Sequence, residues 1–512
     1  MEPEYSISLN FNFGIWNFIL SLFGLHNTPS IASSARLKKE IDQAWTAQIS
    51  LFVMLVLNFL HIPLLVLGAF VETYLNTVNA NGGVTNIILL VLTFRVKDIV
   101  RPKPESSSFY SVTGHLDWRT TLDRDIALHR GKELNGMTLN FFTDKSLFED
   151  APEAASEAVM MAEICMMSSK LAYENAAVIK KIITDAWNMN FVAQYDCWNE
   201  CQRQKLTKVF IATDKAQNAD VIVVAFRGTE PFNTLNYITD IDFSWYKFQA
   251  LGQVHVGFLE ALGLGDRNNL ETLAELQRRL LEPGEDGRPT SGLLPHTTQD
   301  ATKPLAYDVV TQQLKVLLSS HKNAKIYVTG HSLGGAMACL YSTLLHYKKE
   351  EGLTSKLGGV YTFGQPRVGD GQFCEFVIEK LTRPVNRYIR VVYNSDIIPR
   401  VPFDLNPILK FKHAGIARFF NPNYAGELLE EVPNKNYFSP CYFIPMEISA
   451  IWEIIYNRFF LSWMYGDEFR ESKTSLLFRI CGLFFPGLGS HSPVNYVNSV
   501  RLGISRSEDT LW

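Results

Sequence analysis

The segment IYVTGHSLGGAMACL at residues 326–340 joins a run rich in β-branched and aromatic residues to a run of small residues. Between the two runs lies Gly330-His331-Ser332-Leu333-Gly334, a G-x-S-x-G pattern. In this pattern the serine occupies a strained turn between a strand and a helix, where a side chain at 330 or 334 would collide with neighbouring backbone. The amides at the start of the helix favour negative charge near the serine. The segment therefore predicts that Ser332 is a nucleophile.

Strand and helix patterns alternate on both sides of this turn. We predict strands at 209–212, 221–226, 325–329, 359–363 and 388–393, and helices at 154–173, 305–320 and 335–347. The run at 221–226 is almost entirely apolar, which is typical of a buried strand. Such alternation predicts an α/β-hydrolase fold with a mostly parallel central sheet, assigned here to residues 106–512. Residues 283–304 are rich in Pro, Gly, Thr and Asp, which predicts a surface insertion.

The general base is expected after the nucleophile in the chain. Three histidines follow Ser332, namely His346, His413 and His491. His346 falls in the helix that leads away from the turn, and the surroundings of His413 are more typical of a surface or core residue. His491 lies in a loop rich in Gly, Pro and Ser, where catalytic residues are common. We therefore predict that His491 is the base.

The catalytic acid is expected between the nucleophile and the base. The candidates are Asp370, Asp396, Asp404 and Asp467. Asp396 follows the apolar run RYIRVVYN, so it stands at the carboxyl end of a strand, where this architecture gathers its site. Asp370 is the alternative, although a turn or helix cap also explains it. The acid would fix the tautomer of the imidazole and stabilise its charged form.

The oxyanion formed during acyl transfer needs two backbone donors. One is expected to be the amide of Leu333, directly after the nucleophile. The second is expected in the turn Phe226-Arg227-Gly228-Thr229, which follows an earlier strand. This chemistry requires neither a cofactor nor a metal, and we predict none.

The composition and the N-terminal residues bear on which partners and which cell compartment to expect. Hydrophobic residues make up 47% of the 512 residues and the formal net charge is −4, so no basic surplus indicates nucleic-acid binding. The seven cysteines form no zinc-type pattern, which predicts reduced thiols in the cytosol. The first residues, Met1-Glu2-Pro3-Glu4, lack the basic segment and directly following apolar core of a secretory signal.

The N-terminal region, residues 1–105, contains an apolar run of 23 residues at 49–71, which is long enough to cross a bilayer. Asn58, His61 and Pro63 interrupt the run, and a shorter apolar stretch at 87–94 follows a Gly82-Gly83 turn. Basic residues flank both ends, whereas a single span would favour one side. We predict a lipid-associating segment over 49–94, either a monotopic hairpin that enters and returns or a pair of interfacial helices, with both ends on the cytosolic side. A buried core helix is the alternative.

The sequence resembles the class 3, or fungal-type, triacylglycerol lipases. The blocks that carry the resemblance are AFRGT at 225–229, VHVGFLEAL at 254–262, GHSLGGAMA at 330–338, YTFGQPRVGD at 361–370, RVVYNSDIIPRVP at 390–402 and HSPVNYVNSVRLG at 491–503. The resemblance implies that Ser332, Asp396 and His491 form a catalytic triad. It also implies that Thr229 supplies the second oxyanion donor.

Within that family the long N-terminal extension and the apolar insert before His491 resemble the plant oil-body lipases. The resemblance implies triacylglycerol hydrolysis on lipid droplets or the endoplasmic reticulum, with the catalytic domain facing the cytosol. Phospholipid or galactolipid hydrolysis at a membrane is the alternative. A membrane-anchored scaffold with a lapsed hydrolase fold is disfavoured because all three triad residues are present. The oligomeric state is left open.

The spacing between Asp396 and His491 is long for the compact fungal members, which places an insertion at about 405–485. Aromatic residues recur there at near-helical spacing: Trp452, Tyr456, Phe459, Phe460 and Trp463. The insertion is interpreted either as an internally packed helical cap or as an apolar cap that touches lipid. The segment 230–248, which follows the oxyanion turn, is a second candidate for a moving cover.

Overall fold

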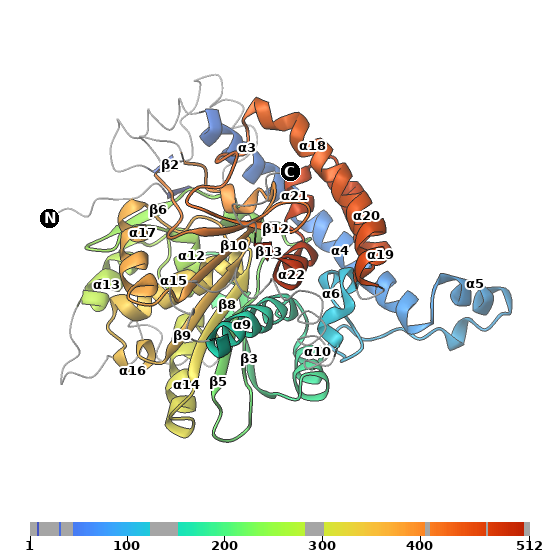
Figure 1. Cartoon of the computed structure of the whole chain (residues 1–512), viewed down its shortest axis with the longest axis horizontal. Helices are drawn as coiled ribbons and strands as arrows, with labels where there is room; N and C mark the ends of the chain where they lie inside the picture. Colours follow the sequence, from blue (N-terminus) through green and yellow to red (C-terminus); the bar gives the residue numbers. More distant parts are fainter. Residues whose placement is uncertain are drawn as a thin grey trace.

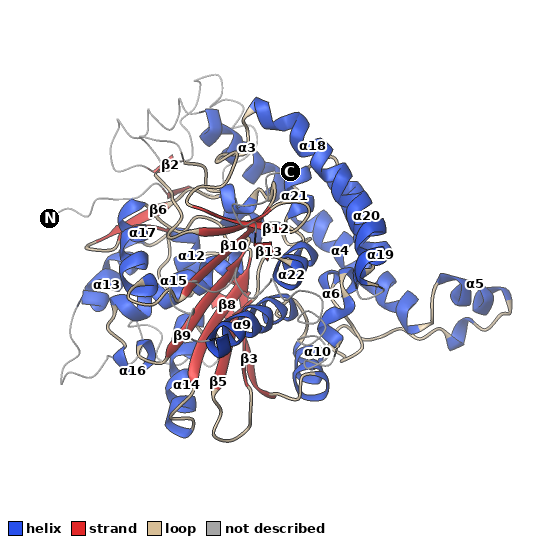
Figure 2. Cartoon of the chain, viewed as in Figure 1, coloured by secondary structure: helices blue, strands red, loops and turns tan. Residues whose placement is uncertain are grey.

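A sheet of nine strands forms the centre of the computed structural model, which describes residues 8–9, 30–31, 45–122, 152–281, 302–404, 410–466 and 469–505. Helices cover both faces of this sheet (Figures 1 and 2). From one edge to the other the strands are β13 (Ile504–Ser505), β12 (Ala425–Leu429), β11 (Ala417–Phe420), β10 (Tyr388–Tyr393), β9 (Leu357–Phe363), β8 (Lys325–His331), β5 (Val221–Phe226), β4 (Gln204–Thr213) and β3 (Asn190–Asn199).

The strands in the middle of the sheet are parallel, antiparallel pairs lie to both sides of them, and β12 and β13 at one edge pair parallel again. Strands β5, β8, β9, β10 and β11 run parallel to one another, whereas β3, β4 and β5 pair antiparallel, as do β11 and β12. The predicted α/β-hydrolase architecture is therefore confirmed. Two small antiparallel pairs lie outside it: β1 (Ser8–Leu9) with β2 (Ser30–Ile31), and β6 (Trp245–Phe248) with β7 (Gly252–His255).

Alternate residues of the strands point to opposite faces and build two separate cores. Val224 and Val328 pack on one face, while their neighbours Val223 and Tyr327 pack on the other. The first face is covered by α12 (Val256–Ala261), α13 (Leu270–Leu281), α14 (Ala306–Ser320), α15 (Leu333–Tyr347) and α17 (Gly371–Val377). The second is covered by α9 (Pro152–Leu171), α10 (Ala176–Lys181), η4 (Ile182–Ala186) and α22 (Pro493–Leu502). The helices predicted at 154–173, 305–320 and 335–347 correspond to α9, α14 and α15.

The N-terminal apolar run is divided rather than continuous. It forms the end of α3 (Trp45–Phe59) and the first half of α4 (His61–Ala80), and α5 (Val84–Leu92) follows the Gly82-Gly83 turn. Pro63 is tolerated because it lies in the first turn of α4, where its missing N–H would have no partner in the helix. Within the described residues α4 is the one helix long and apolar enough to cross a membrane, and only 11% of its apolar window is buried.

The range 405–485 contributes both to the sheet and to a set of helices at its side. Strands β11 and β12 extend the sheet, and α18 (Pro440–Ile455), η7 (Tyr456–Leu461), α19 (Ser462–Tyr465), α20 (Lys473–Gly482) and α21 (Pro486–Ser490) follow. Helices α18 and α20 lie along one margin of the molecule (Figure 1). The predicted insertion at 283–304 falls almost wholly outside the described residues.

The remaining short elements connect these layers. They are η1 (Val96–Asp98), α6 (Val112–Leu116), η2 (Trp118–Thr121), α11 (Thr234–Ile241), α16 (Glu351–Thr354), η5 (Ile378–Thr382) and η6 (Ile398–Arg400). Helix α6 packs against both α4 and α20, so it joins the N-terminal helices to those of the C-terminal region.

Strand β8 and helix α15 cross at contact distance in the middle of the sheet. A Cβ on Gly330 would lie 2.1 Å from the carbonyl carbon and oxygen of Gly334, and a Cβ on Gly334 would lie 2.3 Å from the carbonyl oxygen of Phe226. These contacts involve backbone, which has no flexible side chain that moves aside. Both positions therefore require glycine, as the sequence pattern predicts.

We expect Gly330→Ala to prevent normal folding, because the new methyl group overlaps the backbone of Gly334 and Gly335 at the start of α15. The loss should exceed the 1–3 kcal/mol of ordinary overpacking, about 4 kcal/mol or more. Gly352→Ala is the matched control, since a Cβ at Gly352 in α16 meets nothing within 4 Å. Thermal unfolding measures both variants, and equal midpoints for the two would contradict the steric argument.

Candidate active site

Ser332 occupies the sharp turn between β8 and α15. It is the N-cap residue of α15 with φ 59° and ψ −134°, a strained conformation for a residue other than glycine. Its backbone N–H donates to the carbonyl of Phe363, at the end of β9, across 2.9 Å. The turn is therefore fixed by the neighbouring strand, and the serine side chain stands at the carboxyl ends of the parallel strands.

His491 and Asp396 form a buried pair at the same edge of the sheet. His491 Nδ1 lies 2.7 Å from Asp396 Oδ2, and the Asp396 side chain is fully buried. His491 follows α21, and Asp396 lies three residues beyond the end of β10. A Cβ on Gly364, one residue after Phe363, would lie 3.0 Å from both Asp396 Oδ2 and His491 Cε1. The turn of Ser332 and this pair thus converge around the end of β9.

Several donors fix the Asp396 carboxylate. Its Oδ1 accepts from the amide of Ile398 at 2.9 Å, and its Oδ2 accepts from the hydroxyl of Tyr496 as well as from His491. Burial and the neighbouring carboxylate raise the pKa of Tyr496 well above its ordinary value, so it remains a donor. Hydrogen bonds of this kind stabilise an ionised acid and orient it toward the imidazole.

His331, the residue before Ser332, packs against His491. The His331 ring stacks on the His491 ring at 4.5 Å, and His331 Nε2 lies 3.1 Å from the backbone carbonyl of His491. A carbonyl only accepts, so His331 Nε2 carries the proton and Nδ1 accepts from the hydroxyl of Tyr173 at 2.8 Å. Burial lowers the pKa of His331 well below its usual value, which keeps the ring neutral.

Ser332 Oγ and His491 Nε2 have no hydrogen-bond partner among the described residues. Both are buried, and a buried polar group without a partner requires an explanation. Hydrogen bonds between catalytic groups are often long or poorly aligned until the substrate binds. The arrangement is suited to transferring a proton from the hydroxyl to the imidazole while Asp396 stabilises the resulting charge.

The turn at 226–229 lies directly against the nucleophile. A Cβ on Gly228 would lie 2.3 Å from the carbonyl of His331 and 3.1 Å from Ser332 Cβ. Leu333 begins α15 immediately after the serine. The two predicted oxyanion positions, Thr229 and Leu333, are therefore brought to the two sides of Ser332 by β5 and β8, which pair in the sheet.

Asp240 in α11 is a buried acid that the sequence analysis does not identify. Its Oδ2 accepts from the hydroxyl of Thr229 at 2.9 Å, while Oδ1 has no partner among the described residues. Burial raises the pKa of Asp240 to about 7. The acid lies eleven residues after Thr229, and no motif in the sequence distinguishes it from the other acids of the segment 230–248.

The other sequence candidates lie apart from this cluster. Asp370 caps α17 by accepting from the amide of Phe373 at 3.0 Å, and Asp404 pairs with Lys435. His413 contacts the carbonyl of Pro399 at 2.6 Å, and His346 lies in the last turn of α15. Asp467 lies outside the described residues.

Helix α11 and the N-terminal helices cover the region beside the nucleophile. Ser332 is 0% exposed. Helix α11 packs against both α3 and α4, and His61 Nδ1 of α4 lies 3.1 Å from Thr234 Oγ1 at the start of α11. The segment 230–248, the predicted cover, is thus itself covered by the apolar helices.

One cluster outside this site has the composition of a metal site. Cys201, Glu260 and Asp266 bring their ligand atoms within 4.8 Å of one another. However, Glu260 is engaged by the buried Arg267 at 2.6 Å. That ion pair already neutralises the carboxylate, so the cluster is explained without a cation.

Comparisons with known proteins find a matching family model and relatives that align with most of the chain. A family model described as "Lipase (class 3)" matches residues 223–406. A protein of Nicotiana tabacum named triacylglycerol lipase OBL1 is 38% identical over 501 residues, covering 91% of this chain and 84% of the relative. A protein of the same name from Arabidopsis thaliana is 39% identical over 464 residues, covering 90% of this chain and 85% of the relative. Among solved structures, the native propeptide complex of Rhizomucor miehei lipase aligns with a TM-score of 0.36 at 22% identity, covering 64% of this chain and 93% of that chain.

The raised pKa of Asp240 can be tested through the pH dependence of the unfolding free energy. Its folded value of about 7 lies above the unfolded value near 3.8, so the stability it contributes is complete below about pH 4 and is lost as the pH rises to about 7. Asparagine keeps an acceptor for Thr229 but does not titrate. The unfolding free energy of Asp240→Asn relative to the parent should therefore increase by about 2–3 kcal/mol between pH 5 and pH 8.

Urea unfolding at several pH values measures this difference. Asp220→Asn, which removes an exposed carboxylate of the same kind, controls for the loss of one charge. A stability difference between Asp240→Asn and the parent that does not change with pH would contradict the raised pKa.

Proposed function

Because this chain belongs to the class 3 lipase family and is a carboxylic ester hydrolase, we propose that it hydrolyses triacylglycerol through an acyl-enzyme on Ser332 at a lipid droplet surface. The observation that carries the proposal is the 2.7 Å contact between His491 Nδ1 and Asp396 Oδ2 beside the strained turn of Ser332. The names of the two plant relatives support the choice of triacylglycerol.

The first half of the reaction forms the acyl-enzyme. His491 Nε2 takes the proton of the Ser332 hydroxyl as Oγ attacks the ester carbonyl carbon, which gives a tetrahedral oxyanion. The amides of Leu333 and Thr229 donate to that oxygen, and one such donor contributes roughly 3–4 kcal/mol of barrier lowering. When the carbon–oxygen bond breaks, His491 returns the proton to the departing diacylglycerol oxygen.

The second half repeats these roles with water. His491 takes a proton from water, the hydroxide attacks the acyl carbon, and the fatty acid leaves as the proton returns to Ser332 Oγ. Asp396 remains ionised throughout and stabilises the charged imidazole. Because His331 is neutral, it holds the backbone of His491 without placing a second positive charge beside the ring.

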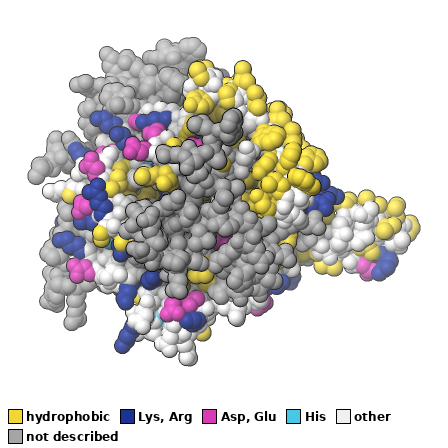
Figure 3. Space-filling model, in the orientation of Figure 1, with side chains coloured by type: hydrophobic (Ala, Val, Ile, Leu, Met, Phe, Trp, Pro, Cys, Tyr) yellow, Lys and Arg dark blue, Asp and Glu magenta, His cyan; other side chains and the backbone are white. Residues whose placement is uncertain are grey.

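Exposed apolar side chains support the proposed location. Helices α18–α20 and the residues just after them expose Phe443, Ile448, Ile451, Trp463, Leu477 and Phe484, here called the C-terminal apolar surface. Figure 3 shows a band of apolar atoms over α18–α20 at the margin of the molecule. On the N-terminal side, α4 and α5 expose Phe70 and Leu92 at 68% and 69%. Since α6 contacts both α4 and α20, the two apolar regions are neighbours, as one docking face for lipid requires.

The segment 49–94 is proposed to form a monotopic hairpin or an interfacial helix pair in the lipid monolayer, while α3 and α4 keep their contacts with α11. A droplet has water on one side only, so a segment cannot pass through it to a second aqueous face. Helices satisfy their backbone hydrogen bonds internally, which apolar surroundings demand. The Gly82-Gly83 turn separates α4 from α5. In this proposal the chain returns after that turn, so that the catalytic domain remains on the cytosolic side.

The triad is tested by substitution. Ser332→Ala, His491→Ala and Asp396→Asn should each lower kcat by about 10³-fold or more while leaving the thermal midpoint close to that of the parent. The Ser332→Ala/His491→Ala double variant should be hardly worse than Ser332→Ala, because the residues act as a unit. Asp370→Asn is the matched control. Full activity in Asp396→Asn together with loss in Asp370→Asn would reassign the acid.

The assay for these variants measures fatty-acid release from emulsified triacylglycerol, monoacylglycerol, phospholipid and galactolipid side by side. We expect the highest kcat/KM on triacylglycerol. A clear preference for phospholipid or galactolipid would instead identify the chain as a polar-lipid acyl hydrolase at a membrane.

The location is tested with the N-terminal region. Residues 1–105 fused to a fluorescent protein should reach droplets or the endoplasmic reticulum. Deletion of 49–94 should release much of the enzyme from lipid, with partial binding retained through the C-terminal apolar surface. Protease added outside intact microsomes should cut on both flanks of the segment, and protection of one flank would show that it spans.

A further inference from the structure

Helix α18 carries its polar side chains inward and its apolar side chains outward. Phe443 and Ile448 on the outer side are 63% and 62% exposed, whereas Glu453 is 3% exposed. This arrangement is the reverse of an ordinary surface helix in water. The inward polar groups therefore need partners inside the protein, and the structure shows which ones they have.

The first partner is the segment that carries the catalytic acid. Asn394 lies directly after β10, two residues before Asp396, and has φ 37°. Its side-chain amide donates to Ser449 Oγ at 2.7 Å and to Glu453 Oε1 at 2.6 Å. Residues 449 and 453 are one turn apart on α18, so one side of the helix holds both hydrogens of the amide. The position of the acid segment thus depends on α18.

The second partner is the segment that carries the base, and it is reached through Arg479 of α20. Arg479 Nη1 donates to Glu453 Oε2 at 3.0 Å, and Nη2 donates to Asn495 Oδ1 at 2.5 Å. Asn495 Nδ2 donates in turn to the carbonyls of Gly489 and Ser490 at 3.3 and 3.2 Å, immediately before His491. The ion pair between Glu453 and Arg479 therefore connects α18 and α20 to the segment of Asp396 and to the segment of His491.

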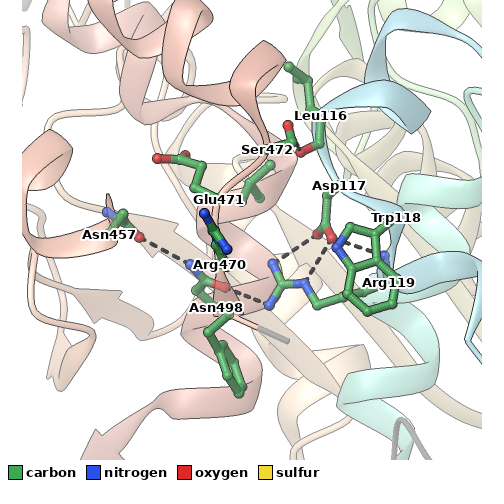
Figure 4. A pocket seen from close by; sticks show the side chains of 11 residues that line it. Leu116, Asp117, Trp118, Arg119, Asn457, Arg470, Glu471, Ser472 and Asn498 are labelled. Carbon is green, nitrogen blue, oxygen red and sulfur yellow. Dashed lines mark hydrogen bonds and ion pairs between the residues drawn. The ribbon is translucent and has the colours of Figure 1, made fainter. Parts of the chain in front are cut away.

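The third nitrogen of the Arg479 guanidinium also has a partner. Arg479 Nε donates to Glu471, which lines a small pocket together with Asp117, Arg119 and Asn498 (Figure 4). In that pocket Arg119 donates to Asn498 at 2.7 Å, so α22 is held there too. Buried charges of this kind are costly unless every member is paired, and here each charge has a partner. Burial raises the pKa of Glu453, as expected for a carboxylate deep in the protein.

We propose that Glu453 and Arg479 are positioning residues that connect the C-terminal apolar surface to the segments of Asp396 and His491, so that a lipid surface docked on α18 and α20 raises kcat. The inference rests on the proposed function. In water the outer side of α18 is unfavourably exposed, so the helix also samples positions in which Asn394 and Asn495 are less well held. Lipid on the outer side favours the position in which both triad segments are aligned.

The experiment uses the full chain, a short-chain ester below its solubility limit, and vesicles of a dialkyl ether phosphatidylcholine that no esterase cleaves. The parent should show an increased kcat when vesicles are added. Glu453→Gln should lower kcat without vesicles about ten- to a hundredfold with little change in KM, because it misplaces the triad and not the substrate. It should also lose the stimulation by vesicles while still floating with them.

Three further variants separate coupling from simple damage. Glu447→Gln, the same substitution on α18 outside the network, should behave as the parent does. Ile448→Ser, on the outer side, should show weaker flotation with vesicles and weaker stimulation by them than the parent shows. Arg479→Lys keeps the positive charge but loses the fork that joins Glu453 to Asn495, so it should reproduce the kcat loss even if Glu453→Gln does not fold.

The outcomes distinguish the two proposals. A parent without hydrolytic activity on any ester would overturn the proposed function and this inference with it. An active parent, with Glu453→Gln and Arg479→Lys at the parent kcat, would overturn the inference alone. An active parent that vesicles bind but do not stimulate would also overturn it.

Discussion

The close crossing of β8 and α15 is the constraint on which the rest of the site depends. With Gly330 and Gly334 in backbone contact, the chain has no room to relax the turn, and Ser332 is held at φ 59°. The strain is tolerated because the strand lies in the middle of the sheet and the helix is buried along nearly its whole length. Strands β5 and β10 of the same sheet then place the turn at 226–229 and Asp396 at the same edge.

Burial determines the protonation of the groups around the nucleophile. His331 and Asp240 are both removed from water, and in each case the uncharged form is favoured, by a lowered pKa for the histidine and a raised pKa for the acid. Asp396 differs from them in accepting three hydrogen bonds, from the Ile398 amide, the His491 ring and the Tyr496 hydroxyl. The Asp396 side chain is thus oriented toward His491, and the uncharged His331 ring stacks on the His491 ring without adding a charge there.

The outward-facing apolar helices explain how an enzyme with a fully buried serine is suited to a water-insoluble substrate. Helices α3 and α4 cover α11, which bears Asp240, while α18 and α20 hold the segments of Asp396 and His491. Both sets of helices also expose apolar side chains. The helices proposed to contact lipid on their outer sides therefore contact the site, or the segments that carry it, on their inner sides. Transfer of these side chains from water to lipid is favourable at about 25 cal/mol per Å² of apolar area.

The sequence by itself determined the α/β-hydrolase fold, its main strands and helices, and the residues Ser332, Asp396 and His491 as the predicted triad. It did so because these features depend on local patterns: apolar runs, two glycines around a serine, and the order of motifs in the chain. The tertiary structure alone brought in Asp240, Tyr173 and Glu453, whose partners lie on other elements. It also divided the apolar run at Leu60, joined β11 and β12 to the sheet, and turned the polar side of α18 inward. Such contacts depend on which surfaces meet, and neither periodicity nor spacing along one chain records that.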